Sequence, residues 1–308
     1  MRSELLRLPS NRFWNIKMDY IQLFIDAFLG TVKWTWRSII FDVPWQRNYF
    51  WGLIVISIAV FALEIMFPWR KGQKIFRKDF WLDGFYMFFN FFIFTVFISG
   101  FYKCISKFST DVLTLKMTSL SIIDLSDFQP VVQLLLFFVV LDFVQWFTHT
   151  LLHRYDFLWK FHKVHHSVKE MGFAAHLRYH WMENILYKPL KVLALMLLGG
   201  FQPEQAYVVH FLAIAIGHLN HANLKLDYGP LKYILNNPIM HLYHHAYSLP
   251  ESFKNGANFA ISLSLWDFIF KTNYVPKPDK NLRLGYNDDA KMPKSFWGQL
   301  SYGFRKGD

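Results

Sequence analysis

Long apolar runs recur along this chain, and polar or charged segments separate them. A membrane helix needs about 20 mostly apolar residues, and three runs approach that length. We therefore expect membrane-spanning helices at residues 49–67, about 81–102 and about 131–147. Residues 18–41 are amphipathic rather than uniformly apolar, so we expect them to lie on the membrane surface.

A further apolar stretch lies in the second half of the chain, but Gly199, Gly200 and Pro203 interrupt it. Glycine and proline break regular helices. This stretch is therefore predicted to form a hairpin of two more spans, 186–201 and 204–221. The whole pattern predicts an all-α, integral membrane helical bundle of about four to five spans.

Basic residues in the connecting segments orient the predicted spans. The first connection, 68–80, carries five basic residues against one acidic residue, whereas the second, about 103–129, carries three lysines and three aspartates. Cytoplasmic loops are enriched in Lys and Arg, so we place the first connection in the cytoplasm. The end of the third span, both ends of the hairpin and the chain from about residue 222 onward then fall on that same side.

Composition supports a membrane setting. Only 18% of the residues are charged, below the quarter or so that is usual in soluble proteins, and 20% are aromatic. The formal net charge is +11, but Lys and Arg lie between apolar runs, which favours contact with anionic lipid head groups over nucleic acid. We expect an N-terminal amphipathic arm (1–47), a membrane domain (48–275) and a C-terminal cytoplasmic tail (276–308).

Nearly all of the 13 histidines are clustered. Ten of them form two short-spaced pairs and two His-x-x-His-His runs: His149 with His153, His162 with His165 and His166, His218 with His221, and His241 with His244 and His245. Residues three or four apart share one face of a helix, so each group presents its imidazoles together. Adjacent histidines diverge by about 100°, so they can reach two neighbouring points more easily than one.

The number of histidines predicts a dimetal centre. A first-row metal takes at most about six ligands, so ten converging imidazoles imply two ions. Imidazole suits zinc, copper, iron and nickel alike. An all-nitrogen site at the ends of apolar helices favours redox-active iron over structural zinc, so we predict two Fe ions.

Four other polar residues bear on this centre. An acid inside a membrane span is costly unless it is paired, and Asp142 lies on the same helical stripe as His149, so we expect its carboxylate to orient that imidazole. His176 and His180 are possible additional ligands, or else line the substrate site. His210 stands alone in an apolar helix and is expected to be a hydrogen-bonded core residue.

The motifs around these histidines resemble those of the fatty acid hydroxylase superfamily, which includes sterol desaturases and C-4 sterol methyl oxidases. The resemblance covers about residues 130–275 and rests on segments 142–153, 158–167, 178–183, 217–223 and 241–272. The sequence departs from the family pattern at Trp181, where the family usually has proline after histidine.

The resemblance implies membrane helices under a cytoplasmic helical cap, with a diiron centre between them and O2 as co-substrate. It also implies residues that support the metal ligands without binding the metal themselves. The matching positions are Asp142, Glu183, Asn223 and Asp267. Family members take electrons from cytochrome b5, ferredoxin or a reductase. The sequence shows neither a fused cytochrome b5 motif nor a cysteine set for an iron–sulfur cluster, so we expect a separate electron-transfer protein.

The predicted function is that of an oxygen-dependent diiron monooxygenase or desaturase of lipid metabolism. It would act by C–H abstraction on a membrane lipid, such as a sterol or a fatty acyl chain, in the bacterial inner membrane or the endoplasmic reticulum. A membrane metal transporter and a structural metal-binding membrane protein are the alternatives. Transporters hold their ligands near the bilayer midplane, whereas these clusters lie at span ends and in loops. Carotenoids, sphingoid bases and alkylglycerols also stay open as substrates.

Overall fold

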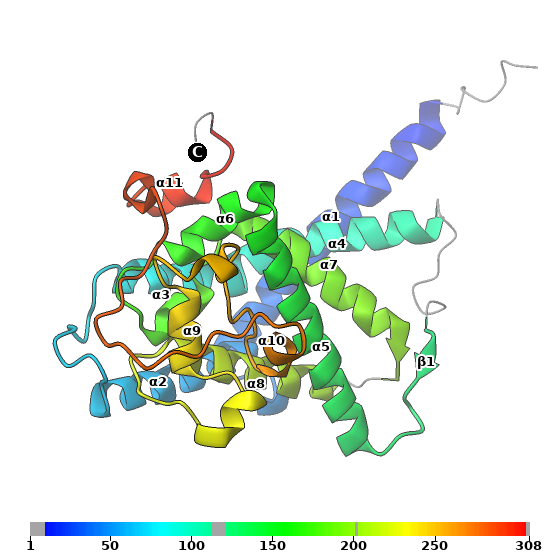
Figure 1. Ribbon diagram of the computed structural model, residues 1–308. Coiled ribbons are helices and arrows are strands. Elements are labelled where there is room, and N and C mark those ends of the chain that lie inside the picture. Colours follow the sequence, from blue (N-terminus) through cyan, green and yellow to red (C-terminus); the bar gives the residue numbers. More distant parts are fainter. Residues whose placement is uncertain (1–9, 112–120, 201–202, 306–308) are drawn as a thin grey trace, which may run out of the picture.

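The structure, a computed structural model, describes residues 10–111, 121–200 and 203–305. Its regular structure is helical apart from one two-stranded sheet in the described part of the chain, in which β1 (Ile123–Asp124) pairs in parallel with β2 (Leu198–Gly199). The predicted all-α class is therefore confirmed (Figure 1).

Three helices are long and apolar enough to cross a membrane, within the ranges that the structure describes. They are α2 (Tyr49–Met66), the continuous run of α3 (Phe80–Phe88), a π-helical turn (Phe89–Ile93) and α4 (Phe94–Asp111), and α5 (Pro130–Arg154). They match the three main runs of the sequence, and they mark the chain as an integral membrane protein. Helix α5 continues past the expected end at residue 147, so His149 and His153 belong to this helix.

The two segments of the expected hairpin form helices α7 (Trp181–Leu197) and α8 (Pro203–His221), with β2 between them, but each helix packs against α5 more extensively than against the other. Neither is among the helices that are long and apolar enough to span a bilayer. Helix α7 carries Glu183, Lys188 and Lys191 and contains Pro189. The count of four to five spans is thus not confirmed, and the two additional spans stay a prediction.

Helix α1 (Ser10–Ile39) includes the segment expected to lie on the membrane surface, and it packs along α4 (Figure 1). The contact is close because Gly100 faces Phe24, where an added Cβ would collide with the ring. Phe28 and Phe97 meet edge to face with ring centroids 5.5 Å apart. The outward face of α1 is apolar as well, with Leu29 exposed, so this helix pair presents a broad apolar surface.

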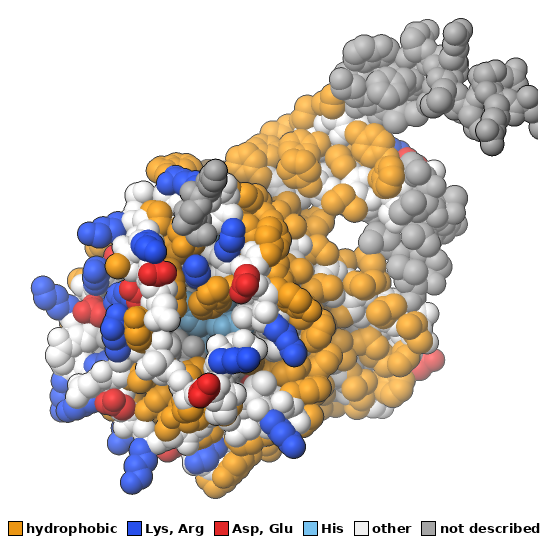
Figure 2. Space-filling model, turned by 45° about the horizontal axis from the view of Figure 1, so that its top comes forward, with side chains coloured by type: hydrophobic (Ala, Val, Ile, Leu, Met, Phe, Trp, Pro, Cys, Tyr) orange, Lys and Arg blue, Asp and Glu red, His pale blue; other side chains and the backbone are white. Residues whose placement is uncertain are grey.

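The remaining elements are short and gather at one end of the bundle. They are helices α6 (Asp156–His166), α9 (Pro238–His244), α10 (Leu265–Ile269) and α11 (Phe296–Leu300), with 3₁₀ helices at Phe173–Leu177, Gly229–Tyr233, Glu251–Phe253 and Asp289–Lys291. One further 3₁₀ helix, Trp45–Arg47, lies away from them, between α1 and α2, where Arg47 pairs with Glu204 in the first turn of α8. Figure 2 shows Lys, Arg, Asp and Glu side chains concentrated on this end, whereas the flank is mainly apolar. We call this charged end the cap.

Two buried aspartates fasten one cap segment, residues 257–263, to helix α5. Asp267 accepts hydrogen bonds from the backbone N–H groups of Phe259 and Ala260, both at 3.0 Å, and from Trp146 Nε1 on α5 at 3.0 Å. Asp142 on α5 accepts from the backbone N–H groups of Ser262 (3.1 Å) and Leu263 (3.0 Å). Charge-assisted hydrogen bonds of this kind are stronger than neutral ones, so the two carboxylates fix where this segment lies.

We expect Asp267→Asn to destabilise the protein by about 2 kcal/mol or more, because its amide would turn a donor toward groups that need an acceptor. The change should lower the unfolding temperature of the purified protein in detergent. Asp288→Asn is the matched control, because Asp288 is exposed, has a positive φ of 66° that asparagine tolerates, and pairs with Lys291 only at the surface. Equal unfolding temperatures for the two variants would contradict the role of Asp267.

Candidate metal centre

Nine of the ten predicted ligands meet in two groups. The first group holds five histidines, from α5, α6 and α9: His149, His153, His162, His166 and His244. The second holds four, from α6, α8 and α9 with the residue after it: His165, His221, His241 and His245. Within each group, the ring nitrogens that face inward all lie within 4.8 Å of one another. We call them the five-histidine group and the four-histidine group.

Adjacent histidines serve different groups. On α6, His166 joins the five-histidine group while His165 joins the four-histidine group, and His244 and His245 divide in the same way at the end of α9. Side chains turn by about 100° per residue along a helix, which is why neighbours in sequence point to separate positions. The two groups are nevertheless adjacent, since the ring centroids of His166 and His245 are 4.4 Å apart.

Burial keeps the cap imidazoles neutral at ordinary pH. Desolvation lowers the pKa of His165 to about 3. Desolvation, with a further contribution from neighbouring histidines, lowers the pKa of His162, His166 and His244 well below the ordinary value. Neutral imidazole is the form that binds a metal ion, so these rings are in the state that ligation requires.

Fixed acceptors hold the outer nitrogen of several rings. His149 Nδ1 donates to the Phe259 carbonyl oxygen over 2.6 Å, and His244 Nδ1 donates to that of Ala257 over 2.8 Å. Three more rings are held similarly: His162 by Glu183 Oε2 (3.0 Å), His165 by the Arg178 carbonyl (3.0 Å) and His221 by the Gly217 carbonyl (2.7 Å). Such outer contacts fix the tautomer and the direction of metal-ligating histidines.

The tautomers show that a cation fits between the rings. A carbonyl oxygen only accepts, so Nδ1 of both His165 and His221 carries the ring proton and each Nε2 presents a lone pair. These two Nε2 atoms face each other at 3.3 Å with no proton to share. In the five-histidine group, the buried Nε2 atoms of His153, His166 and His244 have no hydrogen-bond partner among the described residues. A metal ion would accept these lone pairs, so the donor set fits one.

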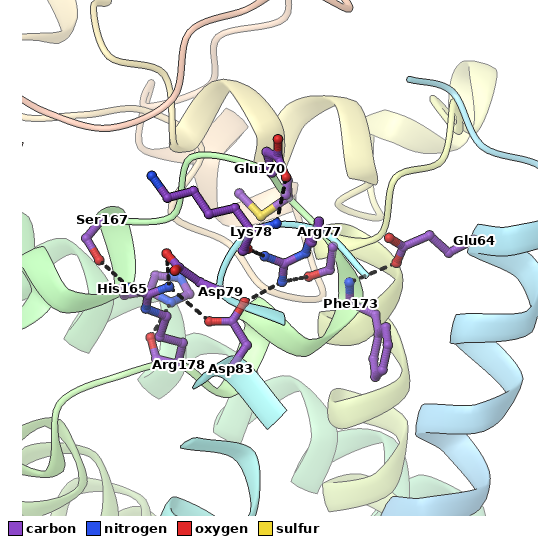
Figure 3. Close-up of polar contacts among 12 residues, drawn as sticks. Glu64, Arg77, Lys78, Asp79, Asp83, His165, Ser167, Glu170, Phe173 and Arg178 are labelled. Atoms are coloured by element: carbon purple, nitrogen blue, oxygen red, sulfur yellow. Dashed lines mark hydrogen bonds and ion pairs between the residues drawn. The ribbon is translucent and has the colours of Figure 1, made fainter. Parts of the chain in front are cut away.

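A buried network of charges holds the residue that positions His165 (Figure 3). The Arg178 guanidinium donates to Asp83 Oδ1 on α3 at 3.1 Å and to Ser167 Oγ at 3.1 Å. Asp83 also accepts from Arg77 Nη2 at 2.5 Å. The Arg178 backbone carbonyl, which binds His165, is therefore tied to the first residues of a membrane helix.

Asp142 does not orient His149, contrary to our expectation. The two residues are seven apart, which separates them by about 10 Å along the helix. The Asp142 carboxylate binds the backbone of Ser262 and Leu263 and the indole of Trp266 instead. Its effect on His149 is indirect, through the segment whose Phe259 carbonyl holds that ring.

The other residues expected behind the ligands differ in their roles. Glu183 contacts a ligand candidate directly, through His162 Nδ1. Asp267 acts through the backbone of Phe259. Asn223 contacts no clustered histidine by any hydrogen bond of the described residues; it binds the backbone of Arg70, so it anchors the connection after α2.

Three predicted histidines lie outside both groups. His218 is within 3.1 Å of Ser57 Oγ through Nε2 and within 2.9 Å of His176 Nδ1 through Nδ1, so both of its ring nitrogens have protein partners. Its assignment as a ligand stays a prediction. His180 caps α7 by accepting from the Met182 N–H, while its Nε2 donates to the Leu300 carbonyl oxygen, so it has a structural role.

A cavity of about 580 Å³ extends from the histidines into the bundle. His149, His162, His165 and His221 line one part of it. Most of the remaining wall is apolar and aromatic, supplied by helices α1, α5, α7 and α8 and by the π-helical turn before α4. His210, expected in a closed core, lines this cavity instead.

Sequence patterns did not reveal the carbonyl groups of Ala257, Phe259 and Gly217 that hold the rings, because a backbone carbonyl has no side-chain signature. Arg178 could have been noticed, because it begins one of the motifs that carry the family resemblance. The structure buries its side chain, and a buried arginine needs partners.

Comparison with known proteins agrees with the motifs. Residues 134–272 match the family model for fatty acid hydroxylase. The chain is 31% identical over 176 residues to an ornithine lipid hydroxylase of Rhizobium tropici (57% of this chain, 51% of that protein). It is 30% identical over 148 residues to an alkylglycerol monooxygenase of Danio rerio (46% and 30%) and 25% identical over 153 residues to a sphingolipid C4-hydroxylase of Schizosaccharomyces pombe (49% and 50%).

These matches span about half or less of the length of each of these relatives. No solved structure matches the chain at a significant level. The family match covers most of α5 and all of α6, α8 and α9, which together carry eight of the nine clustered histidines, and it also covers His245, which follows α9. The segment at residues 134–272 is therefore a fatty acid hydroxylase domain.

Proposed function

We propose that this protein is an oxygen-dependent lipid hydroxylase whose nine clustered histidines bind two iron ions. The observation that carries the proposal is the convergence of nine histidines, nearly all of them buried, in two adjacent groups, with four of the nine lining a largely apolar cavity among membrane helices. The named relatives are hydroxylases or monooxygenases of an ornithine lipid, alkylglycerols or a sphingolipid, which supports hydroxylation over desaturation.

Iron bound at the two groups would supply oxygen activation and the oxidation of an unactivated C–H bond. The protein does the rest. Backbone carbonyls and Glu183 hold the rings in one tautomer, and the cavity wall binds the lipid chain beside His149 and His165. Apolar walls also exclude water, which protects a reactive centre from side reactions.

We further propose that the histidines face the cytoplasm, where a separate protein supplies electrons. The basic connection after α2 lies against the cap: Lys78 N–H donates to Glu170 Oε2 at 2.8 Å, and Arg77 donates to the Gly172 carbonyl at 3.5 Å. The positive-inside tendency of this connection therefore supports the same side for the histidines.

The direct test uses purified, iron-loaded protein with a chemical reductant and a membrane lipid extract, with and without oxygen. We expect lipid products heavier by one oxygen atom, formed only in the presence of oxygen. An iron-loaded, reduced protein that oxidises no lipid, or one that moves metal across vesicle membranes, would defeat the proposal.

His165→Ala and His244→Ala should each abolish turnover, because each removes a ligand from a different group. Each variant should also lose about half of the bound metal, measured by elemental analysis of the purified protein, since ligands rather than bulk folding hold the ion. His210→Asn is the control for metal content, because His210 lies outside both groups. Full activity in either alanine variant would remove that residue from the ligand set.

Glu183→Gln should weaken metal binding at the five-histidine group by about tenfold to a hundredfold, because a neutral amide holds His162 less firmly than a carboxylate does. Competition with a graded series of chelators measures this affinity. Glu170→Gln is the matched control, since Glu170 contacts only the Lys78 backbone in the described part of the chain and should leave the affinity unchanged. Identical chelator curves for both variants would refute a role for Glu183.

A further inference from the structure

Two lysines of helix α7 line the cavity that reaches the histidines. Lys188 and Lys191 are half-buried, and their side chains face this cavity. Lys188 Nζ donates to Thr95 Oγ1 on α4 at 3.2 Å, and Lys191 Nζ lies 5.6 Å from the centroid of the Tyr187 ring. Lys188 and Lys191 are three residues apart on α7 and therefore share one face of the helix, so their ammonium groups repel each other.

Neither lysine forms an ion pair with any residue that the structure describes. The cavity wall does contain two acids, Asp142 and Glu183, but both have other partners. Asp142 is bound by the backbone of residues 262–263 and by Trp266, and Glu183 is bound by His162 and by the N–H of His180. The cavity therefore offers two cations whose hydrogen-bonding capacity is only partly used.

Placing cations in such surroundings is unfavourable without compensation. Ionisable residues among membrane helices are costly and usually mark a path or a binding site for a charged group. Lysines near the ends of membrane helices often reach toward the head groups with their long side chains. Lys188 and Lys191 instead face a wall that includes Phe91, Phe92 and Ile214.

We propose that Lys188 and Lys191 bind the acidic group of the lipid substrate, a carboxylate or a phosphate. This inference rests on the proposed function, since it takes the cavity to be the substrate site. An oxyanion between the two lysines would accept charge-assisted hydrogen bonds from both and would remove their mutual repulsion. Thr95 keeps Lys188 in place for this contact.

The position of the lysines would set the distance along the lipid between its acidic group and the carbon that is oxidised. On α7, Lys188 and Lys191 follow Glu183 by five and eight residues, or about 8 Å and about 12 Å along the helix axis. Glu183 contacts His162 of the five-histidine group. The lipid chain would thus run from the lysines toward the histidines, and the distance between them would select the carbon that reacts.

The experiment measures binding and needs no turnover. Purified wild-type protein in detergent is titrated with a long-chain fatty acid, with an alkyl phosphate of the same chain length and with the matching uncharged alcohol. We expect at least one of the two acids to bind at least about tenfold more tightly than the alcohol. The stronger acid identifies whether the natural group is a carboxylate or a phosphate. A wild-type protein that binds the alcohol as tightly as both acids overturns the proposal.

Lys188→Met and Lys191→Met keep the length of the side chain and remove its charge. Each should weaken binding of the preferred acid by about tenfold or more while leaving binding of the alcohol unchanged. Lys225→Met is the matched control, because Lys225 is exposed outside the cavity and its loss should change neither. Equal weakening of acid and alcohol by the cavity variants, with metal content retained, would show a packing role and overturn the proposal.

The outcomes separate this inference from the proposed function. Acid selectivity that depends on the two lysines, in a protein that never oxidises lipid, supports the anion site and defeats the hydroxylase. Oxygen-dependent lipid oxidation without acid selectivity supports the hydroxylase and defeats the anion site. Should either methionine variant fail to fold, the selectivity of the wild-type protein still decides the question.

Discussion

The structure depends on the burial of nine neutral imidazoles whose lone pairs converge. Polar rings removed from water without partners are unfavourable, and lone pairs that face each other, as between His165 and His221, repel. Bound cations would turn both costs into bonding, so metal binding would also stabilise the cap. This coupling explains why the ligand candidates come from four helices that are distant in sequence but meet at one place.

The residues around the two histidine groups hold the imidazole rings in a fixed geometry. Asp142 and Asp267 hold the segment whose carbonyls of Ala257 and Phe259 fix two rings, and the Arg178 network joins His165 to helix α3. Buried ion pairs are weak evidence for stability, because their desolvation offsets much of their attraction. Their value here is positional, since the pair between Arg178 and Asp83 connects helix α3 to the residue whose carbonyl holds His165.

The cavity connects the helical bundle with the two histidine groups. Its wall changes along its length, from imidazoles at one part to aromatic and aliphatic groups, with Lys188 and Lys191 as the only lysines among its lining residues in the described ranges. An apolar wall accepts a lipid chain directly from the bilayer, while a few polar groups fix its orientation. Helices α1 and α4 add a broad flank of exposed apolar side chains beside the cavity.

The sequence by itself determined the three apolar helices, the helical class and the division of adjacent histidines between two positions, because helix length and the 100° turn per residue are local properties. Only the tertiary structure decided which group contacts the outer nitrogen of each imidazole ring. It replaced Asp142 by the Phe259 carbonyl as the partner of His149, and it paired His218 with Ser57 and His176 outside both groups. Those contacts depend on where distant segments cross and on backbone groups that every residue carries, so no spacing in the sequence could specify them.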